Sequence, residues 1–122
     1  MRAAFAAVAA GQQVAVLVPT TVLCQQHLRS FTERFNAVGA QVASLSRLNT
    51  TQETQTTLEG LAQGKLDVVI GTHKLLGRSV RFKDLSLLIV DEEQRFGVRH
   101  KERIKELCQG VFVIAANRAD IV

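Results

Sequence analysis

Leu87-Leu88-Ile89-Val90-Asp91-Glu92-Glu93-Gln94 is an apolar run followed at once by three carboxylates. The apolar part predicts a buried strand, because a short continuous run suits a strand that is covered on both faces. Acids at the end of such a strand are typical of nucleotide-hydrolysing α/β domains, where Mg²⁺ and a phosphate chain sit at the carboxyl edge of a parallel sheet. These eight residues alone fit a strand followed by a solvated acidic turn about as well.

Apolar runs alternate with helical patterns along the whole chain. The runs predict strands at residues 14–18, 42–46, 67–70, 87–90 and 111–116. Strands that alternate with helices imply right-handed βαβ units and a sheet covered on both faces. We therefore expect an α/β fold with a mostly parallel sheet, formed as a single domain.

Three segments between these runs predict helices. The first has one apolar face at helical spacing, formed by Cys24, Leu28, Phe31 and Phe35. We expect that face to pack on the core. Thr50 and Glu53 have the pattern of a capping box at the start of the second helix, and Gly64 is its expected stop. Residues 100–107 predict a charged helix that is mostly exposed.

The composition is that of a globular domain with one core, at 122 residues and 47% hydrophobic. Cys24 and Cys108 have neither paired nor metal-ligand spacing, which favours a reducing compartment. The three histidines form no ligand cluster, and residues 1–10 are too short to span a membrane. We expect a cytoplasmic protein with no membrane partner.

The net charge of +4 is concentrated in one window of the sequence. Residues 65–105 contain ten of the fifteen Lys and Arg but only six of the eleven acids, so the rest of the chain is neutral. A local basic field favours a phosphate polymer as partner, because binding releases condensed counterions. A basic but merely solvated surface is the alternative. We expect any DNA binding to depend on this window.

Two turns that follow predicted strands are also suited to phosphate. Pro19-Thr20-Thr21 combines a residue that ends the strand with hydroxyls that can cap the next helix. Gly71-Thr72-His73-Lys74 combines a permissive glycine, a hydroxyl and a cation. Plain turns would explain both segments as well, but their shared position after strands strengthens the nucleotide-linked interpretation of Asp91-Glu92.

Three segments carry recognisable motifs: Val14 through Thr21, Ile70 through Leu76 and Leu87 through Arg103. Together they resemble the first motor domain of superfamily 2 DNA translocases, in the branch of the bacterial transcription-repair coupling factors and the RecG helicases. The likeness extends over residues 1–108, and its third segment is highly specific. It implies a RecA-like three-layer sandwich within an ATP-dependent helicase that translocates on double-stranded DNA in transcription-coupled repair.

The resemblance also implies roles for single residues. The residues that would grip a DNA strand are Pro19, Thr20, Thr21, Gly71, Thr72, His73 and Lys74. Asp91 would hold the Mg²⁺ of Mg·ATP through water, and Glu92 would orient and deprotonate the attacking water. Gln94 stands where the family more often has His, and its amide can still relay a hydrogen bond. Arg95 and Arg99 could contact DNA or a second motor domain. The alternative is an exposed helix with surface salt bridges.

The family's phosphate loop, G-x-x-x-x-G-K-[ST], does not occur in these 122 residues. The single Gly-Lys pair is Gly64-Lys65, which is followed by Leu66, and Glu59 stands where the motif requires its first glycine. In the family this loop comes shortly before the segment that matches residues 1–5. We therefore expect residues 1–122 to be a partial helicase ATP-binding domain that lacks the phosphate-loop strand, with unpaired sheet edges exposed.

Residues 109–122 depart from the family pattern. The last predicted strand should lead into Thr-Ala-Thr-Pro, but residues 111–122 read VFVIAANRADIV. A shifted reading frame, a truncated reading frame and a short family remnant would each produce this. The family's second motor domain and its regions that bind RNA polymerase do not match any part of the sequence.

Two functional hypotheses follow. The first is a fragment of the DNA translocase that hydrolyses no ATP alone, and the second is a non-catalytic basic α/β domain that binds DNA or a protein partner. A phosphoacceptor receiver domain would suit the length and the strand pattern. That class is excluded by chemistry, because Pro19-Thr20 and Asn117-Arg118 stand where it needs an acidic pair and a lysine.

Overall fold

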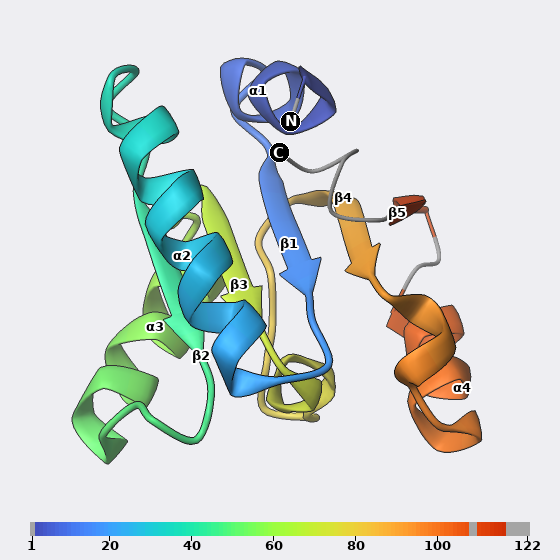
Figure 1. Cartoon of the computed structure of the whole chain (residues 1–122). Coiled ribbons are helices and arrows are strands. Elements are labelled where there is room, and N and C mark those ends of the chain that lie inside the picture. The colour runs from blue at the N-terminus through green and yellow to red at the C-terminus, as the bar shows by residue number, and fades with distance from the viewer. Residues whose placement is uncertain (1, 108–109, 117–122) are drawn as a thin grey trace.

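The computed structural model describes residues 2–107 and 110–116, which form three layers (Figure 1). The strands are β1 (Gln13–Leu17), β2 (Val42–Leu45), β3 (Val68–Gly71), β4 (Leu85–Asp91) and β5 (Phe112–Ala116). The α-helices are α1 (Arg2–Ala9), α2 (Thr21–Asn36), α3 (Thr51–Gln63) and α4 (Val98–Leu107), and the 3-10 helices are η1 (His73–Leu76) and η2 (Glu93–Arg95). The predicted strands and helices are confirmed, with ends that differ by one or two residues. Cys108, Asn117 and Arg118 lie outside the described residues.

The strands form one parallel sheet in the order β2-β3-β1-β4-β5. β1 is central, with Val16 opposite Ile70 on one side and Ile89 on the other. Because all strands run the same way, their carboxyl ends share one edge, which is the lower edge in Figure 1. The predicted parallel α/β fold is confirmed.

Both faces of the sheet are covered by helices. Side chains that alternate along β1 belong to two separate hydrophobic clusters, with Val14 and Val16 in one and Ala15 and Leu17 in the other. α1 and α2 contribute to the first cluster, whereas α3, η1 and α4 contribute to the second. This double cover explains why most residues of the strands are apolar.

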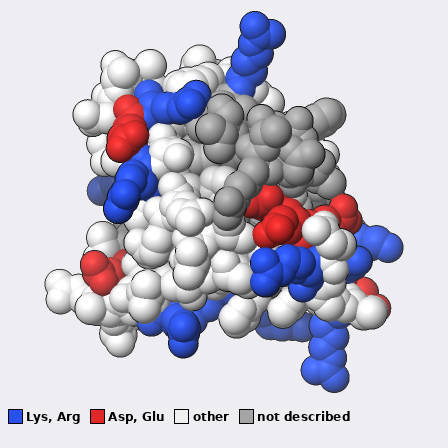
Figure 2. Space-filling model, in the orientation of Figure 1, with Lys and Arg blue, Asp and Glu red and all other residues white. Residues whose placement is uncertain are grey.

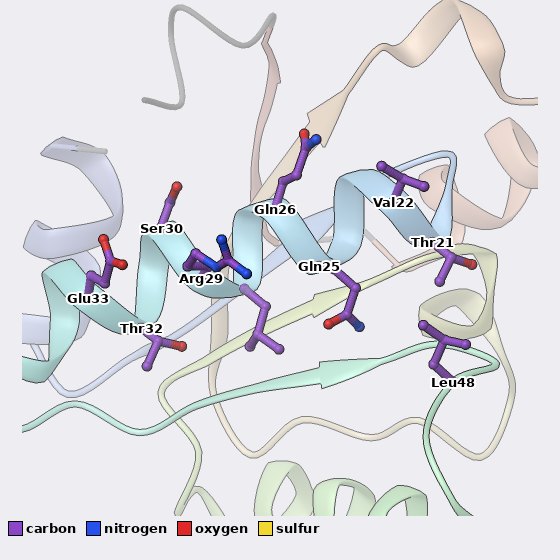
Figure 3. Close-up of a pocket in the computed structure, with 10 residues that line it drawn as sticks. Thr21, Val22, Gln25, Gln26, Arg29, Ser30, Thr32, Glu33 and Leu48 are labelled. Carbon is purple, nitrogen blue, oxygen red and sulfur yellow. The ribbon is translucent and has the colours of Figure 1, made fainter.

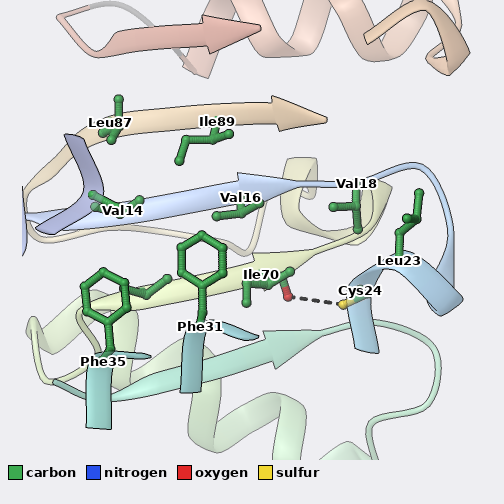
Figure 4. Packing of buried hydrophobic residues seen from close by; sticks show 12 residues of the cluster. Val14, Val16, Val18, Leu23, Cys24, Phe31, Phe35, Ile70, Leu87 and Ile89 are labelled. Atoms are coloured by element: carbon green, nitrogen blue, oxygen red, sulfur yellow. Dashed lines mark hydrogen bonds between the residues drawn. The ribbon is translucent and has the colours of Figure 1, made fainter. Parts of the chain in front are cut away.

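Helix α2 supplies the largest side chains of the first cluster. Phe31 and Phe35 are fully buried and stacked, with ring centroids 5.7 Å apart (Figure 4). Phe5 of α1 stacks on Phe35 at 4.3 Å, which joins the two helices on this face. Cys24 is also buried, and its thiol donates a hydrogen bond to the carbonyl of Ile70 at 3.4 Å. The predicted core face of this helix is confirmed.

Burial raises the pKa of the Cys24 thiol to about 11 from an ordinary value of 9.0. Between these two values the unfolded chain loses the thiol proton while the folded chain keeps it. We expect folding stability to fall as the pH rises from 9 to 11, by up to about 3 kcal/mol from this group. Urea unfolding at pH 8, 9, 10 and 11 should show a shallower alkaline loss in Cys24→Ala than in the unaltered chain. Equal slopes would contradict the assignment.

Gln13 closes the opposite, amino-terminal end of the sheet. It is 3% exposed, and its amide nitrogen donates to the carbonyls of Leu61 and Leu66 at 2.9 and 3.0 Å. Its amide oxygen accepts from the N–H of Asp84 at 2.9 Å. One side chain therefore ties β1 to the segments before β3 and β4.

Helix α3, the second of the predicted helices, begins and ends as expected. Thr50 accepts from the N–H of Glu53 at 3.1 Å while the Glu53 carboxylate accepts from the N–H of Thr50 at 2.8 Å. Gly64 ends α3 with φ at 77°, a left-handed conformation that glycine adopts without a Cβ clash. The capping box and the glycine stop are both confirmed.

β5 is an edge strand of the described sheet, and Val113 on it is 41% exposed. The described sheet is therefore open at this edge. Among the described residues, no helix has the length and apolar character that crossing a bilayer demands.

Candidate functional site

The three segments predicted to carry chemistry follow three neighbouring strands. Residues 19–21 follow β1, residues 71–74 end and follow β3, and residues 91–94 end and follow β4. Because β1 lies between β3 and β4, these segments meet at one edge. After β1 the chain crosses the face covered by α2, and after β4 it enters the face covered by α4. Strand ends whose connections leave in opposite directions mark the topological switch point at which α/β sheets bind ligands, and we call this part of the edge the crevice.

The segment after β1 begins helix α2. Thr20 is the N-cap, and its hydroxyl accepts a hydrogen bond from the N–H of Leu23 at 3.2 Å. Thr21 is half-buried, and its hydroxyl accepts from the Arg47 guanidinium at 3.4 Å. The remaining N–H groups of the first turn, with Arg47 beside them, make this helix start suitable for an anion.

The segment after β3 is held tightly at its start and is exposed at its end. A Cβ on Gly71 would lie 3.0 Å from the carbonyl oxygen of Leu45, so glycine permits the close approach of β2. Thr72 is 5% exposed, and its carbonyl accepts from the N–H of Leu75 at 2.9 Å. His73 and Lys74 are exposed on η1. This turn presents one cation and one imidazole to solvent beside the crevice.

Asp91, the last residue of β4, is fully buried and forms a hydrogen bond with a histidine. Its Oδ2 lies 2.9 Å from Nε2 of His27, whose side chain is 3% exposed. Among the described residues no group donates a hydrogen bond to the other oxygen, Oδ1, although it too is buried. A buried carboxylate oxygen without a donor costs free energy, so its location at a crevice points to a ligand that donates.

Glu92 has a left-handed backbone conformation, with φ 51° and ψ 54°. Such a conformation costs a residue with a Cβ about 1 kcal/mol, and such strain often occurs at functional sites. The conformation turns the chain out of β4, so Glu92 is half-exposed while Asp91 stays buried. Its carboxylate pairs with Arg95 at 3.3 Å, three residues further on.

This strain predicts an inverted preference between two small residues at position 92. Glycine pays no Cβ penalty in the left-handed region, so we expect Glu92→Gly to be about 1 kcal/mol more stable than Glu92→Ala. The loss of the partly exposed pair with Arg95 is the same in both variants. Thermal unfolding compares them directly.

The matched control for this comparison is the neighbouring Glu93 within η2. There Glu93→Ala should be at least as stable as Glu93→Gly, because glycine loses more backbone entropy on folding. The same order at both positions would show that residue 92 is unstrained.

The other predicted residues lie around the crevice on exposed positions. Gln94 and Arg95 are exposed on η2, and Arg99 is exposed on α4. Figure 2 shows Lys and Arg side chains along the lower border of the view, the border at which the strands end, with acidic side chains beside them at the right. The edge therefore combines a cationic rim with one group of acids.

A hollow of about 770 Å³ lies beside α2 (Figure 3). It is lined by Thr21, Gln25 and Arg29 of α2 and by Leu48 of the loop after β2. Val22 and Leu48 at its rim are 66% and 61% exposed. Neither Asp91 nor Glu92 lines this hollow, which shares only Thr21 with the three segments at the strand ends.

His27 is the member of the site that sequence reasoning missed. Histidine spacing alone shows no ligand cluster, and the described residues contain no group of three or more His, Cys, Asp or Glu side chains able to hold a metal ion. The available signal was helical phase, since His27 is three residues after Cys24 and four before Phe31 on the apolar face. On β4, Asp91 shares the parity of Leu87 and Ile89, which face α2.

The parallel three-layer fold and the acidic end of β4 are those of a helicase motor domain of the RecA-like kind. The family model of the DEAD/DEAH box helicase matches residues 1–118. The chain therefore belongs to the DEAD/DEAH box helicase family.

Within that family, the chain is similar over its length to transcription-repair-coupling factors. The factor of Staphylococcus haemolyticus (strain JCSC1435) is 54% identical over 121 residues, and that of Staphylococcus aureus (strain USA300) is 53% identical over 121 residues. Each match covers 99% of this chain and 10% of the relative, so the chain spans about a tenth of the length of these proteins. The resemblance inferred from the motifs is confirmed.

Solved structures agree with the family assignment. The chain is similar to RecG bound to a three-way DNA junction, with a TM-score of 0.72 and 37% identity, over 88% of this chain and 14% of that chain. The Mycobacterium smegmatis helicase Lhr, bound to ssDNA and AMP-PNP, has a TM-score of 0.63 at 17% identity over 75% of this chain and 12% of that chain, and supports the fold alone. The predicted RecA-like fold class is confirmed.

Proposed function

We propose that the chain is a segment of the first motor domain of an ATP-dependent double-stranded DNA translocase that acts in transcription-coupled repair. The observation that carries this proposal is the meeting of residues 19–21, 71–74 and 91–94 at the carboxyl ends of three adjacent strands. A motor must bind nucleotide and DNA close together, and this edge offers acids and cations to both. A cytoplasmic location follows from a role on bacterial DNA.

Asp91 and Glu92 would divide the nucleotide chemistry. The Asp91 Oδ1 atom is buried and has no donor within residues 2–107 and 110–116, which fits an oxygen that accepts from water bound to Mg²⁺. Bound Mg²⁺ would neutralise charge on the β- and γ-phosphates. Glu92, half-exposed next to it, would orient the attacking water and take its proton. Gln94 would relay a hydrogen bond between the nucleotide side and the DNA side.

ATP turnover is not expected from these 122 residues alone. They contain no phosphate-loop sequence, so no lysine of that loop reaches the β- and γ-phosphates and no hydroxyl of it reaches Mg²⁺. Contacts with RNA polymerase would belong to other regions of a longer translocase.

DNA would lie across the exposed rim of the crevice. The helix start at Thr20 and Thr21 offers N–H groups, while Lys74 and Arg99 offer cations from η1 and α4. The turn formed by Gly71, Thr72 and His73 would follow the DNA backbone. Arg95 would add positive charge once its ion pair with Glu92 opens. Phosphate contacts of this kind position a strand without reading its sequence.

The test removes two cations from that rim. We expect Lys74→Ala with Arg99→Ala to weaken binding of a DNA duplex at least tenfold at low salt. The slope of log K against log salt should fall by about 2, because two phosphate contacts are lost. Fluorescence anisotropy between 25 and 200 mM salt measures both quantities.

The matched control removes two cations from elsewhere. Arg2→Ala with Arg34→Ala lowers the net charge equally, but Arg2 lies on α1 and Arg34 in the last turn of α2, away from the strand ends. An unchanged slope in the Lys74 and Arg99 variant, or an equal fall in the control, would count against this surface.

The second candidate is a basic α/β module that binds DNA or a protein without nucleotide. It is favoured by one observation, the concentration of the net charge of +4 within residues 65–105. Binding of Mg·ATP in the low-micromolar range supports the motor segment. A DNA affinity that is the same with and without Mg·ATP supports the module.

A further inference from the structure

The buried bond between His27 and Asp91 connects helix α2 to the acidic end of β4. We propose that His27 is a positioning residue, which fixes the Asp91 carboxylate so that one oxygen is held by α2 and the other is turned toward a divalent cation. The inference rests on the proposed function, because it concerns the metal role of Asp91. His27 is not among the residues to which the motifs assign a role.

The proposed metal role of Asp91 requires an ionised carboxylate, which can only accept a hydrogen bond. In that state Nε2–H of His27 is the donor of the 2.9 Å contact. The side chains are 3% and 0% exposed, so water does not compete for the bond. Phe31 meets the imidazole edge-on at 6.3 Å and limits its rotation. The ring is therefore held both by packing and by its partner.

The two oxygens of Asp91 have different surroundings. Oδ2 accepts from His27, whereas Oδ1 is buried with no donor among the described residues. A carboxylate that was free to rotate could exchange these oxygens, but the bond to a packed ring prevents the exchange. Side chains that hydrogen-bond a metal-binding group in this way orient it and tune its affinity.

The same helix carries the turn that is predicted to hold DNA. Thr20 caps α2, and His27 follows seven residues later, about 10 Å along the helix axis. Leu23, Cys24 and Phe31 anchor this part of α2 in the core. A rigid element thus joins the DNA-facing turn to the carboxylate on the nucleotide side, and the His27 bond is the contact through which it does so.

The experiment compares two replacements at position 27. His27→Gln keeps an N–H donor at a similar reach, whereas His27→Phe keeps a ring of similar shape against Phe31 but cannot donate. Mn²⁺ replaces Mg²⁺ as the probe, because its paramagnetism broadens the amide signals of residues near Asp91 in proportion to occupancy. We expect His27→Phe to bind Mn²⁺ about tenfold more weakly, and His27→Gln to stay within about threefold of the unaltered chain.

A metal-free measurement stands beside the titration. Long-range ¹H–¹⁵N spectra of the imidazole should show the proton of His27 on Nε2 in the unaltered chain. A neutral ring protonated on Nδ1 instead would overturn the inference even if the His27 variants did not fold.

The titration distinguishes the positioning role of His27 from the metal role of Asp91. Asp91→Asn should abolish the broadening, which establishes that the ion is at this site. If Mn²⁺ binds the unaltered chain and His27→Phe equally well, the positioning role of His27 is wrong while the metal role of Asp91 stands. If the unaltered chain binds no more Mn²⁺ than Asp91→Asn, both are wrong.

Discussion

Phe31→Ala is expected to lower the free energy of unfolding by about 3–5 kcal/mol. The Phe31 side chain is fully buried between α2 and the sheet, and it stacks on Phe35 at 5.7 Å. Truncation removes that apolar contact and leaves a cavity that the surrounding strands cannot fill. Urea unfolding followed by circular dichroism measures the loss.

Two controls define this expectation. Phe31→Leu keeps most of the volume and should cost less than about 2 kcal/mol. Val38→Ala removes apolar atoms from a side chain that is 62% exposed and should change stability by less than about 0.5 kcal/mol. A small loss in Phe31→Ala, equal to that of Val38→Ala, would show that α2 does not pack on the sheet as described.

Gln13→Met is expected to cost about 3 kcal/mol, although it replaces a polar side chain in the core by an apolar one. The replacement removes the donor to the carbonyls of Leu61 and Leu66 and the acceptor for the N–H of Asp84. The Leu61 carbonyl keeps the N–H groups of Gly64 and Lys83, but the Leu66 carbonyl and the Asp84 N–H lose this partner. A main-chain group left buried without a partner costs about 1–3 kcal/mol. Chemical unfolding of both proteins at pH 7 checks the size of the loss.

Gln13→Glu separates hydrogen bonding from side-chain volume. Its carboxylate can still accept from Asp84, but it faces two carbonyls without a donor, so the variant should be less stable than Gln13→Met at pH 7. Gln52→Met on an exposed position of α3 provides the control and should be nearly neutral. A Gln13→Met variant as stable as the unaltered chain would contradict the bonding described for residue 13.

The strands were predictable because both of their faces are buried. Their residues are mostly apolar, with Ser44 of β2 and Ser86 of β4 as interruptions, so the strands can be recognised without knowledge of their neighbours. The helix starts at Thr20 and Thr50 and the stop at Gly64 were equally local, since capping depends on residues three or four apart. The positions of residues 19–21, 71–74 and 91–94 at one edge followed from the parallel arrangement.

Three features could not be predicted because they depend on contacts between distant residues. Gln13 and His27 are polar residues whose hydrogen-bond partners lie 48 to 71 positions away. The periodicity of apolar residues gives no information about such pairs. The left-handed conformation of Glu92 is imposed by the surrounding structure against the preference of the residue. The strand order β2-β3-β1-β4-β5 likewise depends on how the two hydrophobic clusters assemble.

The most direct test of the central claim is a map of amide chemical shifts during titration with a DNA duplex. We expect the shifts to cluster at residues 19–21, 71–74 and 91–99, at the carboxyl ends of β1, β3 and β4. Shifts concentrated instead on α1 and the amino-terminal ends of the strands, or no shifts at low salt, would contradict the claim that this edge is the DNA surface of a translocase motor.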